Sequence, residues 1–354
     1  MPFPLVITII LFFVSFLLPK NKILFFVQIV WIALLAGLNT NAADFQNNYE
    51  TYYFANTNGD PYNLYNWLAM TFKSHFVNYV YFNFFLVIIS TILIAIFILR
   101  LSKFPNLVIS LFYIFPFVDS VIQKRWYYAM GILTIGLFLL LKEKKWGYLL
   151  YFLVVWIASQ FHSGALLLYT LPIFMLIPFK WEKRIAIGSI IFGIIINKYL
   201  SQIVTLILPS YLQEKNQLYF STLASSSSVA HTILWTLWQA LFILIVFYAY
   251  KNKKSTSTFD DAVLRMNLWS AVLVLFYAYD PVFARLFRPI LILDYIYVTN
   301  ELFFNISWNT RKAAFVNFSM LSMSILSFVL FDVMSVWGFN YIVMQIFENN
   351  LLFR

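Results

Sequence analysis

The sequence predicts an all-α polytopic integral membrane protein with about twelve transmembrane helices, within a range of about 10 to 14. Three observations predict this fold class. Of the residues, 62% are hydrophobic and only 11% are charged, and the mean hydropathy is +0.80. Apolar runs recur along the chain, and several of them reach about 17 to 25 residues, the length that a helix needs to cross a bilayer. Backbone groups in lipid must be satisfied within their own segment, so runs of this length form helices.

The apolar runs are the predicted transmembrane helices, in chain order. They cover residues 5–18, 23–38, 76–99, 104–122, 126–141, 146–160, 164–179, 185–197, 232–250, 262–278, 289–304 and 313–331. Two long polar stretches, about residues 39–75 and 198–231, interrupt them and are expected to be loops on the outer side. The whole chain, residues 1–354, is expected to form a single transmembrane domain.

The positions of lysine and arginine predict the orientation, because short cytoplasmic loops carry an excess of both. One choice places sixteen of the 24 basic residues in the cytoplasm and both long loops outside. The cytoplasmic clusters are then those at residues 20–22, 100–103, 142–145, 180–184, 251–265 and 311–312. The net charge of +10 then reflects a basic collar that faces anionic lipid. Membrane lipids are therefore expected partners, and nucleic acid is not.

The inventory of reactive side chains excludes several chemistries. The chain has no cysteine, which removes disulfides, thiolate metal sites and a thiol nucleophile. Its three histidines, His75, His162 and His231, lie far apart without the spacing of a metalloenzyme. Neither a metal nor a cofactor is expected.

Lys124 and Arg125 stand between two apolar runs on the predicted outer side. An arginine at the bilayer centre costs about 2.5 to 3.5 kcal/mol and stays protonated, so an anionic partner is expected. The helix predicted to begin at residue 126 would add the positive end of its dipole. The alternative is that both cations only anchor a helix end among lipid headgroups.

His162 and Ser163 interrupt two further apolar runs on the same side. The imidazole can accept a proton or donate a hydrogen bond to a substrate. Alternatively, it is simply a residue at the corner of a helical hairpin. No Gly-x-Ser-x-Gly motif supports a serine hydrolase.

Arg285 and Arg288 lie three residues apart, just before Pro289. Two guanidinium groups at this spacing can converge on a phosphate. Asp280 and Asp294 flank them, so an internal cluster of salt bridges is the alternative.

The first outer loop is rich in tyrosine, asparagine and aspartate, including Asp44, Tyr49 and Asp60. Aromatic rings stack on sugar faces, and carboxylates and amides exchange hydrogen bonds with sugar hydroxyls. The loop therefore predicts a sugar site, although an ordinary interfacial loop has a similar composition.

These motifs, taken in order, resemble the EpsG family. The resemblance rests on Asp44 followed by Tyr49, Pro-Tyr-Asn-Leu at 61–64, Gln-Lys-Arg-Trp-Tyr-Tyr-Ala at 123–129, Phe-His-Ser-Gly-Ala at 161–165, and the pair Arg285 and Arg288. It extends over about residues 5–312. Members are polytopic bacterial exopolysaccharide and capsule proteins, similar to Wzy-type repeat-unit polymerases. Here the segment 39–44 keeps the family's aspartate without its arginine.

The resemblance implies a glycosyltransferase of GT-C-like architecture. It would transfer a glycan from polyprenyl diphosphate, such as undecaprenyl diphosphate, onto another lipid-linked repeat unit. The reaction would take place on the outer face of the bacterial cytoplasmic membrane and without a metal. Arg125, His162 and Asp44 are the expected catalytic residues. The expected substrate-binding residues are Gln123, Lys124, Tyr49, Asp60, Tyr128, Arg285 and Arg288. Other polysaccharide-assembly proteins are further expected partners.

Two other function classes stay open from the sequence. A transporter or flippase of lipid-linked oligosaccharide also has about twelve helices, but its two halves would show an inverted repeat. A membrane acyltransferase that modifies glycans would also use a histidine such as His162.

Overall fold

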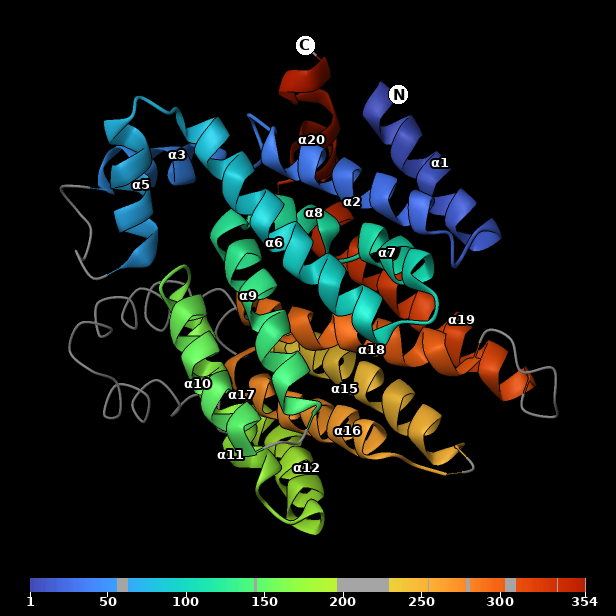
Figure 1. Cartoon of the computed structure of the whole chain (residues 1–354). Coiled ribbons are helices and arrows are strands. Elements are labelled where there is room, and N and C mark those ends of the chain that lie inside the picture. The colour runs from blue at the N-terminus through green and yellow to red at the C-terminus, as the bar shows by residue number, and fades with distance from the viewer. Residues whose placement is uncertain are drawn as a thin grey trace. The chain divides into compact units, whose positions relative to one another are not determined.

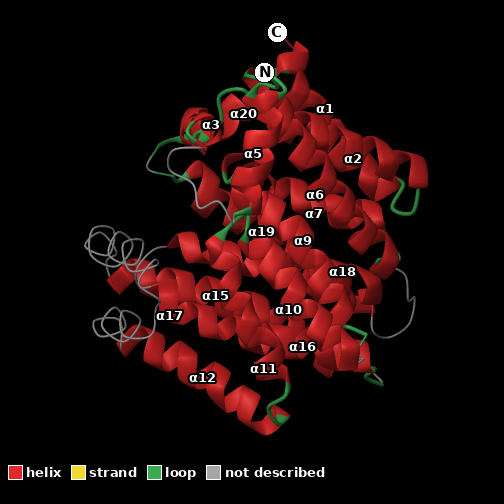
Figure 2. Ribbon diagram, turned by 60° about the vertical axis from the view of Figure 1, so that its left-hand side comes forward, coloured by secondary structure: helices red, strands yellow, loops and turns green. Residues whose placement is uncertain are grey.

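The chain is helical throughout the part that the structure describes. The computed structural model describes residues 1–55, 63–142, 145–195, 229–253, 255–277, 281–302, 310–335 and 337–353. Figure 2 shows helices and loops over these ranges, without a strand. The predicted all-α class is confirmed for them. The chain forms two compact units, Met1–Leu166 with Ile292–Arg354 and Leu167–Leu291.

The first unit holds the N-terminal helices and the end of the chain (Figure 1). Its elements are α1 (Phe3–Leu17), α2 (Lys22–Gly37), α3 (Phe45–Tyr53), α5 (Leu64–Ser74), α6 (Tyr79–Leu101), α7 (Pro105–Ile114), α8 (Phe117–Ile122), α9 (Lys124–Leu140), α10 (Lys145–Ser159), most of α18 (Arg288–Leu302), α19 (Thr310–Phe328) and α20 (Gln345–Glu348). Helix α9 packs between α6 and α10, and α2 packs on the other side of α6. The polar stretch 39–75 contains two of these helices, α3 and α5.

A glycine sets how closely α9 approaches α6. A Cβ atom on Gly131 would lie 2.7 Å from the Cα atom of Ser90. Only glycine permits this distance, because the neighbouring atom is backbone and cannot rotate away. The Ser90 hydroxyl donates to the Tyr128 carbonyl at 3.4 Å. The first turns of α9 are thereby fixed against α6.

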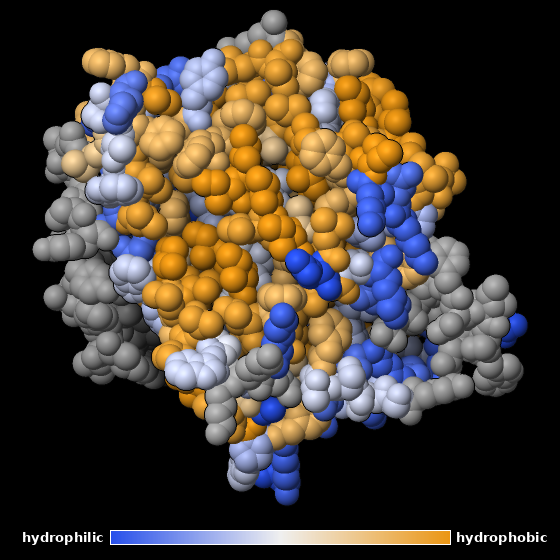
Figure 3. Space-filling view, viewed as in Figure 1, coloured by the Kyte–Doolittle hydropathy of each residue, from blue (hydrophilic) through white to orange (hydrophobic). Residues whose placement is uncertain are grey.

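Three described helices are long and apolar enough to cross a membrane. They are Tyr79–Leu101, Thr232–Lys251 and Ala314–Val333. Five shorter apolar helical segments accompany them, at Phe3–Leu17, Lys22–Gly37, Pro105–Ile114, Trp146–Ser159 and Ser163–Met175. One face of α6 exposes Phe85, Ile89, Ile92, Ile96 and Leu99, and much of the surface in Figure 3 is apolar. This exposed stripe suits contact with lipid. The number of spans, about twelve, stays a prediction.

The single helix predicted over residues 104–122 is wrong. The structure has α7 and α8 there, and they meet at Phe115 and Pro116. Proline has no N–H to donate and restricts the preceding residue to extended geometry. Phe115 has φ −156° and ψ 133°, which is extended. Apolar composition alone could not show this break.

The second unit is a smaller set of helices. They are α11 (Thr170–Met175), α12 (Phe179–Ile195), α15 (Val229–Lys251), α16 (Thr258–Ser270) and α17 (Val274–Tyr277). A 3₁₀ helix, Pro281–Phe287, leads to α18. A partly buried ion pair lies inside this unit, where Arg265 Nε donates to the buried Glu182 carboxylate at 2.7 Å. The predicted outer loop at 198–231 lies almost entirely outside the described residues.

Candidate functional site

Arg125 lies in the first turn of α9 and is held by two contacts. Its Nε donates a hydrogen bond to the Phe161 carbonyl oxygen at 3.1 Å. Its guanidinium carbon lies 4.9 Å from the centroid of the Tyr65 ring, which is a cation–π contact. Among the described residues no carboxylate pairs with Arg125. No hydrogen bond within the described part of the chain engages the two Nη groups, which can offer four N–H donors to an anion.

The start of α9 adds a second source of positive potential. Gln123 occupies the N-cap position, and no side chain caps the helix there. The first amides of a helix lack intrahelical acceptors and carry the positive end of the helix dipole. The predicted combination of a guanidinium and a helix N-terminus is therefore present at one place.

His162 directly follows the residue that binds Arg125. The Gly164 amide donates to His162 Nδ1 at 3.0 Å. The imidazole lies edge-on to the Trp126 ring, at 5.2 Å between centroids. Because Nδ1 accepts a hydrogen bond, the neutral ring carries its proton on Nε2. This arrangement favours His162 as a hydrogen-bond donor over His162 as a base.

Tyrosines from four elements gather beside Arg125. We call this group the outer tyrosine cluster, after the side of the membrane on which the sequence predicts it. It consists of Tyr49, Tyr52 and Tyr53 of α3, Tyr65 of α5, Tyr79 of α6 and Tyr128 of α9. Tyr65 stacks against Tyr128 with 6.5 Å between centroids, so it lies between Arg125 and the bundle core. Burial raises the pKa of Tyr65 to about 12, and Arg125 opposes the rise. Only Tyr49 and Tyr53 are exposed, and their rings are 4.5 Å apart.

The predicted ligand Tyr128 is buried, at 2% exposure. Its hydroxyl donates to the Asn83 side-chain oxygen at 2.5 Å. Tyr128 is therefore a buried residue that packs beneath the ring of Tyr65. Tyr49, the other predicted tyrosine, has its ring exposed.

Asp44 immediately precedes α3. Its carboxylate does not cap the helix, and Asn47 Nδ2 donates to Oδ1 at the long distance of 3.3 Å. The charges of Asp44 and Arg125 both act on the Tyr79 hydroxyl. Two of the three predicted catalytic residues are therefore close enough for their charges to act on one hydroxyl group.

The turn that carries Asp44 is held by the C-terminal segment. Asn39 Nδ2 donates to the Gln345 carbonyl at 3.0 Å, and Thr40 N donates to the Asn349 carbonyl at 2.8 Å. Asn39 and Asn350 also form an isolated β-bridge. These contacts join residues about 300 positions apart, and no local sequence pattern predicts them. We call the pairing of 38–41 with 345–351 the C-terminal latch.

Lys124 lies in a different environment from that of Arg125. It is 1% exposed, and its Nζ donates to the Ala36 carbonyl at 2.7 Å, near the end of α2. Burial lowers the pKa of Lys124 to about 7. The interpretation of Lys124 as a headgroup anchor is therefore wrong, because the side chain points into the bundle.

Arg285 and Arg288 belong to the second unit. Arg285 is half-buried in the 3₁₀ helix Pro281–Phe287, and Arg288 begins α18 with 2% exposure. Their flanking residue Asp280 lies outside the described residues, as does Asp60 of the first loop. Both the phosphate clamp and the salt-bridge cluster stay predictions for this pair.

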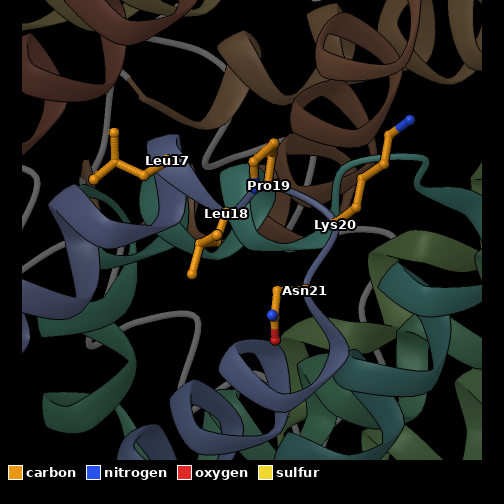
Figure 4. A pocket seen from close by; sticks show the side chains of 5 residues that line it. All are labelled: Leu17, Leu18, Pro19, Lys20 and Asn21. Carbon is orange, nitrogen blue, oxygen red and sulfur yellow. The ribbon is translucent and has the colours of Figure 1, made fainter.

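A pocket at the turn between α1 and α2 is a poor candidate for the site. It is lined by Leu17, Leu18, Pro19, Lys20 and Asn21 (Figure 4). Its polar groups serve the helix ends, since Asn21 accepts from the Leu24 amide at 2.9 Å, and Lys20 lies over the Phe104 ring. No carboxylate or imidazole lines it. In the described part of the chain, no three His, Asp or Glu residues gather as metal ligands would.

Three parts of this site were not predicted from the sequence: the Phe161 carbonyl that binds Arg125, the buried ring of Tyr79 and the C-terminal latch.

Comparison with known proteins gives a match to one family. The sequence model of the EpsG family matches residues 22–344 of the 354-residue chain. No curated protein and no solved structure matches the chain.

Proposed function

Because the chain belongs to the EpsG family of exopolysaccharide-related membrane proteins, we propose that it is a repeat-unit polymerase. It transfers a glycan from a polyprenyl diphosphate, such as undecaprenyl diphosphate, onto another lipid-linked repeat unit. The reaction takes place on the outer face of the cytoplasmic membrane, within about twelve spans of GT-C-like architecture, and its product is a capsular or other exopolysaccharide.

This proposal rests on one observation, which is that Arg125 is held in place without a carboxylate partner among the described residues. The guanidinium is fixed by the Phe161 carbonyl and the Tyr65 ring, yet no described carboxylate neutralises it. Holding an unpaired cation in an apolar bundle is unfavourable unless an anion binds. A diphosphate supplies such an anion, and a guanidinium binds phosphate oxygens in a bidentate manner.

The chemical step is one displacement. The oxygen of the acceptor hydroxyl attacks the anomeric carbon, and the bond from that carbon to the diphosphate oxygen breaks. The bonding electron pair leaves with the diphosphate, where Arg125 and the α9 N-terminus stabilise the charge. The proton of the acceptor hydroxyl passes to Asp44. A single displacement inverts the configuration at the anomeric carbon.

The roles of Asp44 and His162 follow from their hydrogen bonds. The Asp44 carboxylate is not used to cap α3, so it suits the base. His162 accepts through Nδ1 from Gly164, so its Nε2–H suits donation to a phosphate or sugar oxygen. Arg285 and Arg288 are proposed as further diphosphate ligands.

The test is polymerisation by the purified protein in detergent, with a polyprenyl-diphosphate-linked repeat unit as the only substrate. The wild type should form dimers and longer products. Arg125→Ala should lower the rate about 10² to 10³-fold, because a donor to the developing charge is removed. Arg125→Lys should recover little, since an ammonium lacks the bidentate fork.

A matched control is Arg184→Ala. Arg184 also lies over an aromatic ring, with 4.7 Å to Trp181, but it belongs to a predicted cytoplasmic cluster. This variant should polymerise like the wild type. Full activity of Arg125→Ala at equal protein level would overturn the proposed role of Arg125.

A further inference from the structure

One hydroxyl group in the outer tyrosine cluster has no hydrogen-bond partner. Tyr79 is the first residue of α6 and is 1% exposed. Its hydroxyl oxygen is buried and makes no hydrogen bond with any described residue. A buried hydroxyl without a partner costs free energy, so such groups are rare and call for an explanation.

Three buried tyrosines near Tyr79 differ from it, because each of their hydroxyl groups has a hydrogen-bond partner. The Tyr52 hydroxyl donates to the Val77 carbonyl at 2.5 Å. The Tyr128 hydroxyl donates to Asn83 at 2.5 Å, and the Tyr127 hydroxyl lies 2.9 Å from the Thr91 hydroxyl. The bundle therefore supplies a hydrogen-bond partner to three of these four buried tyrosines, and Tyr79 is the exception among them.

The surroundings of Tyr79 belong to the proposed site. Its ring contacts Phe45 at 5.3 Å and Tyr49 at 6.1 Å between centroids, and both lie on the helix that Asp44 begins. The charges of Asp44 and Arg125 both act on its hydroxyl. The unpartnered group is thus exposed to the charges of both the proposed base and the proposed diphosphate ligand.

We propose that Tyr79 is a substrate-binding residue whose hydroxyl hydrogen-bonds a sugar of the acceptor unit. The inference rests on the proposed function and adds a residue that orients the acceptor. A sugar hydroxyl is the fitting partner, because it both donates and accepts, as the tyrosine hydroxyl does. The exposed rings of Tyr49 and Tyr53 cover the same side of the cluster and supply a surface on which a sugar face stacks.

The test compares Tyr79→Phe with Tyr127→Phe, since each variant removes a single buried hydroxyl. Tyr127 lies outside the site, and its hydroxyl has Thr91 as a partner. We expect Tyr127→Phe to lower the melting temperature in detergent and to retain wild-type polymerisation. We expect Tyr79→Phe to keep or raise the melting temperature, because no protein hydrogen bond is lost.

The functional readouts then separate a substrate contact from a structural residue. Tyr79→Phe should raise the KM for the acceptor and weaken binding of the lipid-linked repeat unit, each about tenfold, the effect of one lost hydrogen bond. Wild-type binding and polymerisation by Tyr79→Phe would overturn the inference. So would a fall in melting temperature equal to that of Tyr127→Phe, which would reveal a partner within the protein.

The binding measurement keeps this inference distinct from the proposed function. If the wild type binds the lipid-linked unit without polymerising it, the proposed reaction fails, and the tenfold difference in binding still tests Tyr79. If the wild type polymerises and Tyr79→Phe does so equally well, the proposed function stands and the role of Tyr79 fails.

Discussion

Two adjacent residues of α9, Lys124 and Arg125, have opposite surroundings, although both are basic. Successive side chains on a helix point about 100° apart. Lys124 therefore faces the end of α2, where the Ala36 carbonyl accepts its hydrogen bond, while Arg125 faces the outer tyrosine cluster. The sequence shows only two neighbouring cations. Packing decides that one of them is structural and that the other faces the site.

The buried ammonium of Lys124 predicts a pH dependence of stability. Its pKa in the folded protein is about 7, lowered by burial from 10.5. Between these values the unfolded chain holds a proton that the folded protein lacks, so stability rises with pH in this window. From pH 7 to pH 9 the gain should be about 2 kcal/mol. Below pH 7 the ammonium is charged in both states and the gain is lost.

The measurement is the melting temperature in detergent between pH 6.5 and pH 9, for the wild type and for Lys124→Met. Methionine fills a similar volume without a titrating group. The melting temperature of the wild type should increase as the pH rises. The part of this increase that comes from Lys124 should be absent in the variant. Parallel curves for the two proteins would show that Lys124 does not titrate in this range.

At the scale of the elements, apolar runs predict helices well where no proline interrupts them. Residues 23–38 form α2 (Lys22–Gly37), and residues 126–141 form α9 (Lys124–Leu140). The position of Arg125 at a helix start was predictable for this reason. Pro116, inside the run 104–122, is the sequence signal for the break there. The short helices of the stretch 39–75 were not predictable, because short amphipathic segments depend on what they pack against.

The C-terminal latch is beyond prediction from one sequence, because it pairs polar residues about 300 positions apart. Asn39 is fully buried, and its Oδ1 accepts from the Ala42 amide at 2.7 Å. Asn350 is also fully buried and donates to the Leu34 carbonyl at 3.0 Å. The two side chains therefore fix the turn that leads into Asp44.

Loss of the latch should weaken both stability and polymerisation. Asn39→Ala removes the bonds to Gln345 and Ala42, and we expect a loss of about 1 to 3 kcal/mol of stability, because buried groups are left unsatisfied. Polymer formation should fall as well, since the turn before Asp44 is loosened. Asn252→Ala is the control, because its half-buried side chain donates to a carbonyl four residues earlier, that of Tyr248, and belongs to another part of the chain. A variant Asn39→Ala as stable and active as this control would contradict the role of the latch.

At the scale of the whole molecule, the sequence predicted the helical class and the helix that begins beside Arg125, because both depend on local composition and order. The family match over residues 22–344 agrees with the resemblance seen in the motifs. Orientation follows from the sum of many charges, none of which is decisive by itself. It is nevertheless the property that decides the function class, because a polymerase needs its site on the face where the assembled repeat units arrive.

Cells that lack this protein should separate a polymerase from a flippase. If Arg125, His162 and the outer tyrosine cluster act on the outer face, such cells should accumulate single lipid-linked repeat units that are already outside. A membrane-impermeant reagent that oxidises and labels sugar diols should then mark single units on intact cells. Cells that express Arg125→Ala should give the same labelling, and wild-type protein should restore long polymer. Units that react only after the membrane is permeabilised would instead indicate failed transport, because a flippase acts before the units reach the outer face.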